Sequence, residues 1–368
     1  MRRYKILIFL PSLESGGAER FVVNLLQSLD RNLYVPVLAV IKLSGPFIDI
    51  IPSDVAIYDL GRERVSRSLL KMLRIIRQVE PDIVFSTLGY LNIAVGMIRL
   101  FVGRNICFIA REASNVSMSI EGNIRLTLYK VLYRIFYSRF DLVIAQTQSQ
   151  KNDLIINFGV NEKKVRVVPN PVDCGAVQKL GNKKNKKPKK DKISLIAAGR
   201  LIPVKGFDLL LKAVVELPDT FHLTVMGDGS GLNELKKLSH KLEVEDRVEW
   251  VGFQTNPFGL IQESDLFILS SRYEGFPNVV LEALALGVPV VAFGGPTSAQ
   301  EIIQPGINGY LAEPEDCHSL AEQIEKAVQT DFDRSAIARD VCERFGSQHI
   351  IRIYEKYFLE EAQGRVNG

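Results

Sequence analysis

The sequence predicts an α/β protein with two doubly wound domains, each built on a mostly parallel sheet with helices on both faces. Short apolar runs alternate with longer stretches in which apolar residues recur at helical spacing. Polar or glycine-containing turns follow many of these runs, as they do where parallel strands end at a ligand site. At 368 residues, the chain is also too long for one ordinary hydrophobic core.

The first domain is predicted to span residues 1–172. Its apolar runs are short and rich in β-branched residues, which favours buried parallel strands. The predicted strands are Tyr4–Leu10, Val35–Ile41, Val55–Leu60, Asp82–Ser86, Cys107–Ala110, Leu142–Ala145 and Val165–Val168. The predicted helices are Ala18–Leu29, Ser66–Val79, Leu91–Phe101, Ile124–Tyr137 and Gln148–Phe158.

The second domain is predicted to span residues 173–346, and a final amphipathic helix belongs to residues 347–368. Residues 181–192 are rich in lysine and contain no large apolar side chain, which predicts a solvated linker or loop. The predicted strands cover residues 193–199, 222–226, 248–253, 265–269, 288–293 and 308–311. The predicted helices cover residues 298–303, 319–329, 334–345 and 347–363, with further helices after Pro203 and from Asn278.

The most informative stretch is residues 270–295, with the sequence SSRYEGFPNVVLEALALGVPVVAFGG. It follows the apolar run 265–269 and predicts a polar turn, a helix and a further strand. We expect Asn278 to be the N-cap of this helix and Gly287 to end it. Such a strand–turn–helix unit presents its turn and helix N-terminus to a ligand at the carboxyl edge of a sheet.

Two carboxylates frame this turn, because Glu274 lies in it and Glu282 follows in the helix with seven residues between them. Gly275 lets a ligand approach the backbone, and the amides of Phe276 and Asn278 lie at the helix N-terminus, where anions bind. Carboxylates accept hydrogen bonds from sugar and ribose hydroxyls. The pattern therefore favours a nucleotide sugar, and a capped helix with two solvated acids is the simpler alternative.

Arg200 and Lys205 follow the predicted strand at residues 193–199. Cations at the carboxyl end of a strand can neutralise a diphosphate, arginine through its planar fork and lysine as a point charge. Because the apolar strand delivers both side chains to one place, we favour a diphosphate site over a solvated loop. No Asp-x-Asp triplet follows a predicted strand, since Asp331 and Asp333 lie between helices.

The four cysteines, Cys107, Cys174, Cys317 and Cys342, are scattered and include no Cys-x-x-Cys pair. This argues against a zinc site or a disulfide framework and is typical of a reducing compartment. The first apolar run is short and ends at Pro11, so no signal segment is expected. No apolar segment approaches the ~18 residues needed to span a bilayer, and we therefore expect a cytoplasmic protein.

Charge is distributed unevenly along the chain. Residues 1–172 contain 23 Lys and Arg against 14 Asp and Glu, whereas residues 193–368 contain 15 against 26. A basic half is typical of proteins that bind nucleic acid or an anionic membrane surface. No RNA- or DNA-binding module signature is present, so nucleic acid is the weaker alternative.

Two predicted helices of the first domain carry much of the basic surplus. Residues 67–77 alternate basic and apolar side chains, and residues 123–139 place Arg125, Lys130 and Arg134 among aliphatic and aromatic ones. Such a helix can bury its apolar side at the headgroup boundary while its cations meet lipid phosphates. An ordinary packed helix with a solvated basic edge is the alternative.

The segment EGFPNVVLEALALGVPVV resembles the E-x7-E segment of retaining glycosyltransferases of family 4, which have the GT-B fold. Three further matches occur in the expected order: SLESGGAER at residues 12–20, VPNPVD at 168–173 and GRLIPVKGFDLLL at 199–211. The resemblance covers nearly the whole chain. It implies transfer of a hexose or N-acetylhexosamine, with retention of configuration, from a nucleotide sugar that we expect to be UDP-linked.

The resemblance also implies roles for individual residues. Arg200 and Lys205 would neutralise the leaving diphosphate without a metal cofactor. Glu274 would accept hydrogen bonds from sugar hydroxyls and Glu282 from ribose hydroxyls. The other residues expected at the donor are Gly17, Asn170, Asp228, Gly275, Phe276, Pro277 and Asn278.

The implied acceptor is a growing glycan on a polyprenyl pyrophosphate, reached by a peripheral protein at the inner face of the cytoplasmic membrane. Many family members carry a histidine in the first domain, whereas all four histidines here lie in the second half. Arg111 and Glu112 are our candidates for the corresponding surface, and a structural ion pair is an equal alternative. The residues expected on the acceptor and membrane side are Arg111, Glu112, Arg125, Lys130 and Arg134.

Further functions fit parts of the pattern. An enzyme of the same fold could be a phosphorylase, which a lysine-bound pyridoxal cofactor would reveal, or an epimerase, which would release nucleotide without transfer. A non-catalytic member would bind a nucleotide sugar without turnover. The resemblance also implies that the last helix crosses back onto the first domain.

Overall fold

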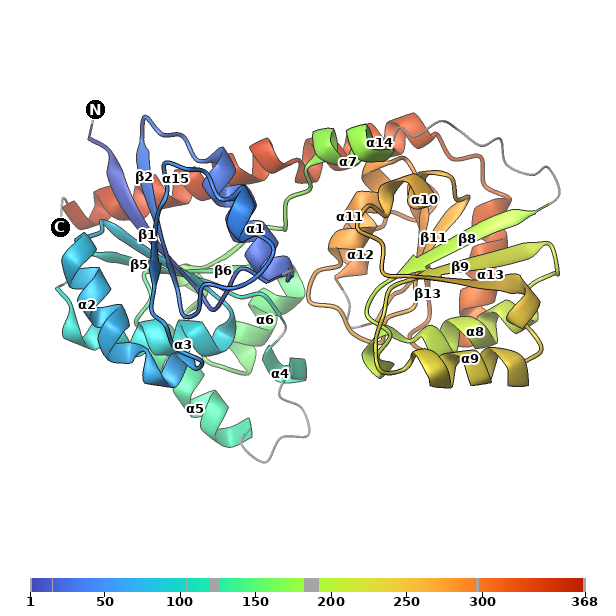
Figure 1. Ribbon diagram of the computed structural model, residues 1–368, viewed down its shortest axis with the longest axis horizontal. Helices are drawn as coiled ribbons and strands as arrows, with labels where there is room; N and C mark the ends of the chain where they lie inside the picture. Colours follow the sequence, from blue (N-terminus) through green and yellow to red (C-terminus); the bar gives the residue numbers. More distant parts are fainter. Residues whose placement is uncertain are drawn as a thin grey trace. The chain divides into compact units, whose positions relative to one another are not determined.

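The computed structural model describes residues 2–14, 16–103, 105–114, 116–119, 126–181, 192–295 and 298–366. The chain divides into two compact units, each built on one parallel sheet (Figure 1). The N-terminal unit comprises Met1–Pro171 and Ser347–Gly368, and the C-terminal unit comprises Val172–Gly346. The lysine-rich run predicted to be a linker lies outside the described residues, apart from its two ends.

The sheet of the N-terminal unit has the strand order β3-β2-β1-β4-β5-β6-β7, with every pair parallel. The chain winds outward from β1 in one direction and from β4 in the other, so the winding reverses between these two strands. The strands are β1 (Tyr4–Leu10), β2 (Tyr34–Val40), β3 (Ala56–Asp59), β4 (Ile83–Thr87), β5 (Cys107–Arg111), β6 (Leu142–Ala145) and β7 (Val165–Val167).

Helices cover both faces of this sheet. One face packs against α1 and α15 in a single apolar core, and the other packs against α2, α3, α5 and α6 in a second core. The helices are α1 (Gly17–Ser28), α2 (Leu69–Val79), α3 (Gly89–Ile98), α4 (Val116–Ser119), α5 (Leu126–Tyr137), α6 (Gln148–Ile156) and α15 (Ser347–Val366).

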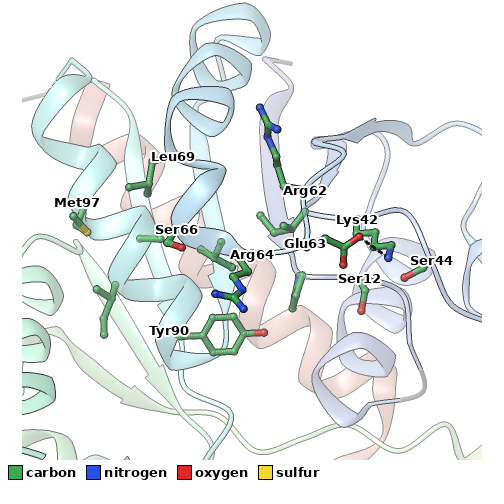
Figure 2. Close-up of a pocket in the computed structure, with 15 residues that line it drawn as sticks. Ser12, Lys42, Ser44, Arg62, Glu63, Arg64, Ser66, Leu69, Tyr90 and Met97 are labelled. Atoms are coloured by element: carbon green, nitrogen blue, oxygen red, sulfur yellow. Dashed lines mark hydrogen bonds and ion pairs between the residues drawn. The ribbon is translucent and has the colours of Figure 1, made fainter. Parts of the chain in front are cut away.

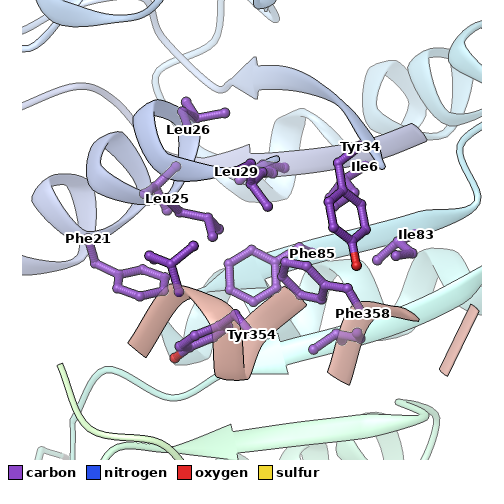
Figure 3. Close-up of a cluster of buried hydrophobic side chains, with 14 of the residues drawn as sticks. Ile6, Phe21, Leu25, Leu26, Leu29, Tyr34, Ile83, Phe85, Tyr354 and Phe358 are labelled. Atoms are coloured by element: carbon purple, nitrogen blue, oxygen red, sulfur yellow. The ribbon is translucent and has the colours of Figure 1, made fainter. Parts of the chain in front are cut away.

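The last helix, α15, is part of the N-terminal unit's core. Tyr354 and Phe358 of α15 pack edge-on against Phe85 of β4, and Tyr354 also meets Phe21 of α1, with ring centroids 5.0–6.2 Å apart (Figure 3). All four rings are at most 3% exposed. Aromatic side chains contribute much of the apolar area that such a core buries, so α15 stabilises a strand, β4, that lies more than 250 residues earlier in the chain.

The sheet of the C-terminal unit has the order β10-β9-β8-β11-β12-β13, again with every pair parallel. Its winding reverses between β8 and β11. The strands are β8 (Ile193–Ala198), β9 (Phe221–Met226), β10 (Val248–Gly252), β11 (Leu266–Leu269), β12 (Val290–Phe293) and β13 (Gly309–Ala312).

Two apolar cores lie on the two faces of this sheet as well. Helices α8, α9 and α13 pack on one face, and α7, α10, α11, α12 and α14 pack on the other. The helices are α7 (Cys174–Gly181), α8 (Phe207–Glu216), α9 (Leu232–Lys241), α10 (Phe258–Gln262), α11 (Asn278–Ala285), α12 (Ala299–Ile302), α13 (Cys317–Val328) and α14 (Arg334–Phe345).

The structure differs from the predicted elements in several places. Helices α4, α7, α9 and α10 were not predicted. The helix expected from Ser66 begins as the 3₁₀ turn Val65–Arg67, and α2 starts only at Leu69. Ser68 separates the two pieces and is fully buried, and its hydroxyl donates to the carbonyl of Arg64.

Cys174 of α7 and Cys342 of α14 form a disulfide, with Cα atoms 6.0 Å apart. The expectation of no disulfide is therefore wrong. The two cysteines are 168 residues apart in sequence, and only the packing of α7 and α14 on the same face of the sheet brings them together. Because two of the four cysteines form a disulfide, the cysteine pattern no longer supports the inference of a reducing compartment.

Candidate functional site

The candidate site of the C-terminal unit lies where the winding of its sheet reverses. β8 and β11 are hydrogen-bonded neighbours, with Leu195 opposite Leu266 and Ile196 opposite Phe267. Because both strands run in the same direction, the loops that follow them start at the same edge of the sheet. In open α/β sheets, ligands bind at this position.

Lys205 and Glu274 come from these two loops and form an ion pair. The Lys205 Nζ donates to Glu274 Oε1 at 2.5 Å, and the Ser271 hydroxyl donates to the same oxygen at 2.8 Å. The two side chains are 22% and 12% exposed. A partly buried, directed charge pair at a strand edge is the kind of site that binds a charged ligand.

Gly206 allows the two loops to approach each other. Its φ is +64°, and a Cβ at this position would collide with the carbonyl oxygen of Ser270. Ser270 in turn donates its hydroxyl to the carbonyl of Lys205 at 3.1 Å. Glycine is therefore required here both for its backbone conformation and for close contact between the β8 and β11 loops.

Arg272 is a site residue that the sequence analysis missed. Its guanidinium donates to both carboxylate oxygens of Asp208, at 2.7 and 2.8 Å, and to the carbonyl of Pro203 at 2.6 Å. It also pairs with Glu315 at 3.0 Å. These hydrogen bonds raise the pKa of Arg272 and lower the pKa of Asp208. Arg272 thus ties the turn before Glu274 to the turn that carries Lys205.

The turn that follows β11 leads directly into α11. The structure places Pro277 at the N-cap and Asn278 as the first helical residue, so the expectation of an Asn278 N-cap is wrong. The backbone amide of Asn278 donates to the carbonyl of Phe276 at 3.1 Å, so it is already used within the turn. Gly275 is half-buried in the turn, and Glu282 is half-buried in the middle of α11.

The remaining candidates of this unit lie on neighbouring loops. Arg200 is exposed directly after β8, and its carbonyl accepts from the amide of Ile202 at 2.8 Å. Asp228 is exposed directly after β9, and its carbonyl accepts from the amide of Leu201 at 2.9 Å. The structure therefore brings the loops of Arg200 and Asp228 into contact at the edge that carries Lys205.

Two of the residues expected at the donor, Gly17 and Asn170, lie in the N-terminal unit. Gly17 is the first residue of α1, after Gly16 at the N-cap. Asn170 is 5% exposed, and its side-chain oxygen accepts from the guanidinium of Arg111. Arg111 also donates to Thr87 at 3.1 Å and lies over the ring of Phe21 at 4.0 Å.

Glu112 lies at the centre of a buried hydrogen-bond network. The Tyr137 hydroxyl donates to Glu112 Oε2 at 2.5 Å, and the Tyr133 hydroxyl lies 3.4 Å from the same oxygen. Asn92 donates both to Tyr137 and to the carbonyl of Arg111, each at 3.0 Å. Burial of this carboxyl raises the pKa of Glu112 to about 7, although its hydrogen bonds act in the opposite direction.

The expected surface position of Arg111 and Glu112 is not found, because each side chain is only 1% exposed. Nor do the two form an ion pair with each other among the described contacts. Arg111 is the last residue of β5 and lies over Phe21 of α1, whereas Glu112 follows the strand and meets Tyr137 of α5. Their contacts order the end of β5 and the inner side of α5.

Helix α5 combines this buried side with an exposed apolar one. Leu128, Val131 and Ile135 are 56%, 47% and 45% exposed at helical spacing. Lys130 is half-buried and Arg134 is exposed, whereas Arg125 lies outside the described residues. In the described part of the chain, no helix has both the length and the apolarity needed to cross a bilayer.

The described residues contain no group of three or more His, Cys, Asp or Glu side chains that could hold a metal ion. Asp333, in the only Asp-x-Asp triplet considered above, instead caps α14 by accepting from the amides of Ser335 and Ala336 at 2.9 Å.

Comparison with known proteins places this geometry in context. Residues 15–175 match the model described as Glycosyltransferase Family 4, and residues 179–345 match that of Glycosyl transferases group 1. An N-acetylgalactosamine-N,N'-diacetylbacillosaminyl-diphospho-undecaprenol 4-alpha-N-acetylgalactosaminyltransferase of Campylobacter jejuni is 28% identical over 371 residues, covering 96% of this chain and 99% of that protein.

The chain is also similar to a second glycosyltransferase sequence and to a solved structure, and the two likenesses cover different shares of the chain. An uncharacterized glycosyltransferase of Methanocaldococcus jannaschii is 31% identical over 257 residues, which span 67% of this chain but only 63% of that protein. The crystal structure of the Anabaena protein HepE in complex with UDP and glucose has a TM-score of 0.81 at 20% identity. That likeness covers 97% of this chain and 100% of the other.

Two Rossmann-like units with parallel sheets of seven and six strands have the architecture of the GT-B glycosyltransferases. The two family models together span most of the chain, from residue 15 to residue 345. The chain belongs to the glycosyltransferases of family 4 and group 1, and it is a transferase enzyme.

Proposed function

We propose that this enzyme transfers a hexose or N-acetylhexosamine from a UDP-sugar to a lipid-linked glycan acceptor, with retention of anomeric configuration. The observation that carries this proposal is the Lys205–Glu274 pair at the point where the winding of the C-terminal sheet reverses. It supplies a cation for a diphosphate and a carboxylate for hydroxyl groups within one hydrogen bond of each other.

Lys205 would contact the diphosphate of the donor, with Arg200 of the same loop as the second cation. The leaving diphosphate gains charge in the transition state, so fixed cations beside it lower the barrier. Arg272, Asp208 and Gly206 hold the Lys205 turn against the β11 loop, which positions this charge without further reorganisation. In this role, the cations replace a metal ion.

Glu274 would accept hydrogen bonds from the hydroxyls of the transferred sugar, and Glu282 from those of the ribose. The backbone from Gly275 to Asn278 would hold the sugar and the phosphate, except for the Asn278 amide, which is already engaged. Asp228 would lie near the nucleoside. Gly17 and Asn170 are the residues that we assign to the donor from the N-terminal unit.

The chemistry of the acceptor is proposed from the Campylobacter jejuni relative, whose likeness covers 96% of this chain. The name of the Campylobacter jejuni enzyme specifies an acceptor that is a glycan on diphospho-undecaprenol. We assign the same class of acceptor here, in the assembly of a surface polysaccharide or glycoconjugate. The protein would then act peripherally at the cytoplasmic face of the membrane, where the lipid is held.

A donor screen tests this function. The full-length protein is expected to unfold at a higher temperature with one or a few UDP-sugars, since a ligand at about a hundredfold its Kd stabilises by about 2.7 kcal/mol. The sugar of the stabilising donor should then be transferred to a synthetic polyprenyl-diphosphate-linked acceptor. NMR of the product should show the same anomeric configuration as in the donor. Transfer should persist in EDTA. Failure of every UDP-sugar to bind, or complete loss of transfer in EDTA, would contradict the proposal.

Membrane attachment through α5 is tested separately. Replacing Val131 and Ile135 with aspartate should weaken binding to phosphatidylglycerol vesicles by about tenfold or more, because each change removes an exposed apolar side chain and adds a repelled charge. Val215→Asp is the matched control, since Val215 on α8 is also 45% exposed but lies in the C-terminal unit. Cosedimentation measures the effect. Equal vesicle binding by the wild type, the Val131/Ile135 variant and the Val215 control would show that α5 is not the attachment surface.

A further inference from the structure

The disulfide between Cys174 and Cys342 takes no part in the chemistry proposed above. Both cysteines are partly exposed, so the disulfide lies at the surface of the C-terminal unit, whereas Cys107 and Cys317 are free thiols. At the cytoplasmic face, where this enzyme is proposed to act, thiols are kept reduced, and a disulfide that forms there is usually transient or redox-sensing. Exposed disulfides are also the ones that exchange most readily with other thiols.

The disulfide joins two helices that both pack on α11. Cys174 is the first residue of α7, and Cys342 lies in the last turn of α14. The side chain of Gln178, also on α7, donates to the carbonyl of Ala285 at the end of α11, at 3.1 Å. The apolar faces of α7, α11 and α14 belong to one core. The cross-link is therefore in direct packing contact with the helix that follows Glu274.

Phe345, the last residue of α14, connects the disulfide to the turn at residues 274–277 that leads into α11, here called the donor turn. Phe345 is 6% exposed, and its ring packs edge-on against Phe276 of the donor turn, with centroids 6.5 Å apart. The backbone amide of Val172, two residues before Cys174, donates to the carbonyl of Phe345 at 2.8 Å. The disulfide and this hydrogen bond together hold the start of α7 beside the residue on which the donor turn rests.

Of the two linked helices, α7 depends more on the disulfide. It has eight residues against twelve in α14, and a helix of this length is marginal in water without tertiary contacts. Its buried residues are Val177 and Gly181, near its middle and its end, whereas its first turn is held by the disulfide. Opening the disulfide therefore releases the first turn of α7 and the last turn of α14 from each other.

We propose that Cys174 and Cys342 form a reversible redox site that controls the order of the donor turn. The consequence for donor binding rests on the donor site proposed above. In the reaction, a thiolate of a dithiol reductant attacks one sulfur of the disulfide and forms a mixed disulfide. The second thiol of the reductant then displaces the cysteine, so the reductant leaves as a disulfide, and the two cysteines gain two electrons and two protons as thiols. Oxidised glutathione reverses this exchange.

The oxidised form is the one that binds the donor well, because the cross-link holds Phe345 against the donor turn. In the reduced form, α7 and the end of α14 are no longer joined, and the donor turn loses part of its support. A ligand that needs the ordered turn then binds more weakly, in proportion to the fraction of molecules in which the turn is formed. The enzyme is thus expected to transfer sugar faster under oxidising conditions at a limiting donor concentration.

Thiol titration of the full-length protein tests the redox site itself. Air-oxidised protein should show two reactive thiols after denaturation, and reduced protein should show four. The disulfide should open in the folded protein with dithiothreitol and close again with oxidised glutathione. Four thiols in the air-oxidised protein, or a disulfide that opens only on unfolding, would overturn the proposal.

Hydrogen exchange measures the order of the donor turn without any ligand. The peptide of residues 271–285 should exchange about threefold or more faster in the reduced protein, since Phe345 is held less firmly against Phe276. Helix α3 is the internal control. It contains no cysteine, and its Tyr90 and Met97 line a cavity of about 690 Å³ in the N-terminal unit (Figure 2). Equal exchange of the 271–285 peptide in both redox states would contradict the proposed control.

Calorimetric titration with UDP connects the redox site to the donor. The oxidised protein should bind UDP about fivefold or more tightly than the reduced protein, which is a usual coupling between two sites. Cys174→Ser/Cys342→Ser should bind UDP as reduced wild type does in both conditions. Cys317→Ser, which changes a free and partly exposed thiol, is the matched control and should keep the difference. Equal UDP affinity of oxidised and reduced wild type overturns the proposal.

A further variant tests the connection through α14. Phe345→Leu keeps an apolar side chain but removes the contact between the two rings. It should retain the disulfide, as shown by thiol titration, and lose most of the difference in UDP affinity between the redox states. A difference as large as that of wild type would show that Phe345 does not connect the disulfide to the donor turn.

Failure of the redox site and failure of the donor site give different results. If exchange of residues 271–285 depends on the redox state but neither form binds UDP, the redox site stands and the donor assignment fails. If both forms bind UDP equally and exchange is unchanged, the donor site stands and the redox site fails.

Discussion

Replacing Lys205 with alanine is expected to reduce sugar transfer by about a hundredfold or more. The ammonium group lies 2.5 Å from Glu274 at the edge where β8 and β11 end, and its side chain is only 22% exposed. Its proposed partner, the leaving diphosphate, carries more charge in the transition state than in the bound donor. The loss should therefore appear in kcat and in kcat/KM to a similar extent.

The measurement is steady-state transfer with the donor found by the screen, and thermal unfolding serves as the test of folding. Lys212→Ala is the matched control, because Lys212 is an exposed lysine of α8 outside the candidate site. Glu274→Gln, which keeps the shape of the side chain but removes its charge, should also reduce transfer by weakening hydrogen bonds from the sugar. Wild-type turnover in both site variants would refute the assigned roles.

Replacing Glu112 with glutamine is expected to remove a pH dependence of stability from the N-terminal unit. Burial raises the pKa of Glu112 from 4.5 to about 7. Between these two values, the folded protein keeps the proton and the unfolded chain releases it. Stability should therefore fall as the pH rises through this interval, by about 3 kcal/mol in total, and should change no further above it.

Glutamine is neutral at every pH, and its amide oxygen can still accept from Tyr137. The variant should thus be similar to wild type near the lower end of the interval and more stable than wild type above about pH 7. Urea unfolding at several pH values measures the difference in free energy. If the free energy of unfolding changed with pH in the same way for both proteins, protonation of Glu112 would not contribute to the pH dependence of stability.

Local patterns in the sequence were enough to predict most of the sheet strands and many of the helices. Tyr4–Leu10, Leu142–Ala145 and Arg334–Phe345 have the predicted bounds, because apolar run length and helical spacing are properties of neighbouring residues. Helix α9 was missed although Leu232, Leu235 and Leu238 recur every third residue, since the stretch is otherwise polar and short. Its leucines face the core only because α8 and β9 place them there.

The candidate site was predicted in part. The motifs at residues 199–211 and 274–282 indicated that Lys205 and Glu274 follow strands, and the order β9-β8-β11-β12 makes those strands neighbours. Arg272 could not be singled out in the same way. Its role depends on Asp208 and Glu315, which are 64 and 43 residues away, and no spacing pattern relates three such positions.

The sequence by itself determined the α/β class, the repeated strand–turn–helix units and the residue types at the strand ends, because each depends on a short segment and its period. Only the tertiary structure decided that Arg111 and Glu112 are buried and that Cys174 meets Cys342. These outcomes depend on which distant segments share a face of a sheet. Burial and pairing are properties of that packing, and no single stretch of the chain encodes them.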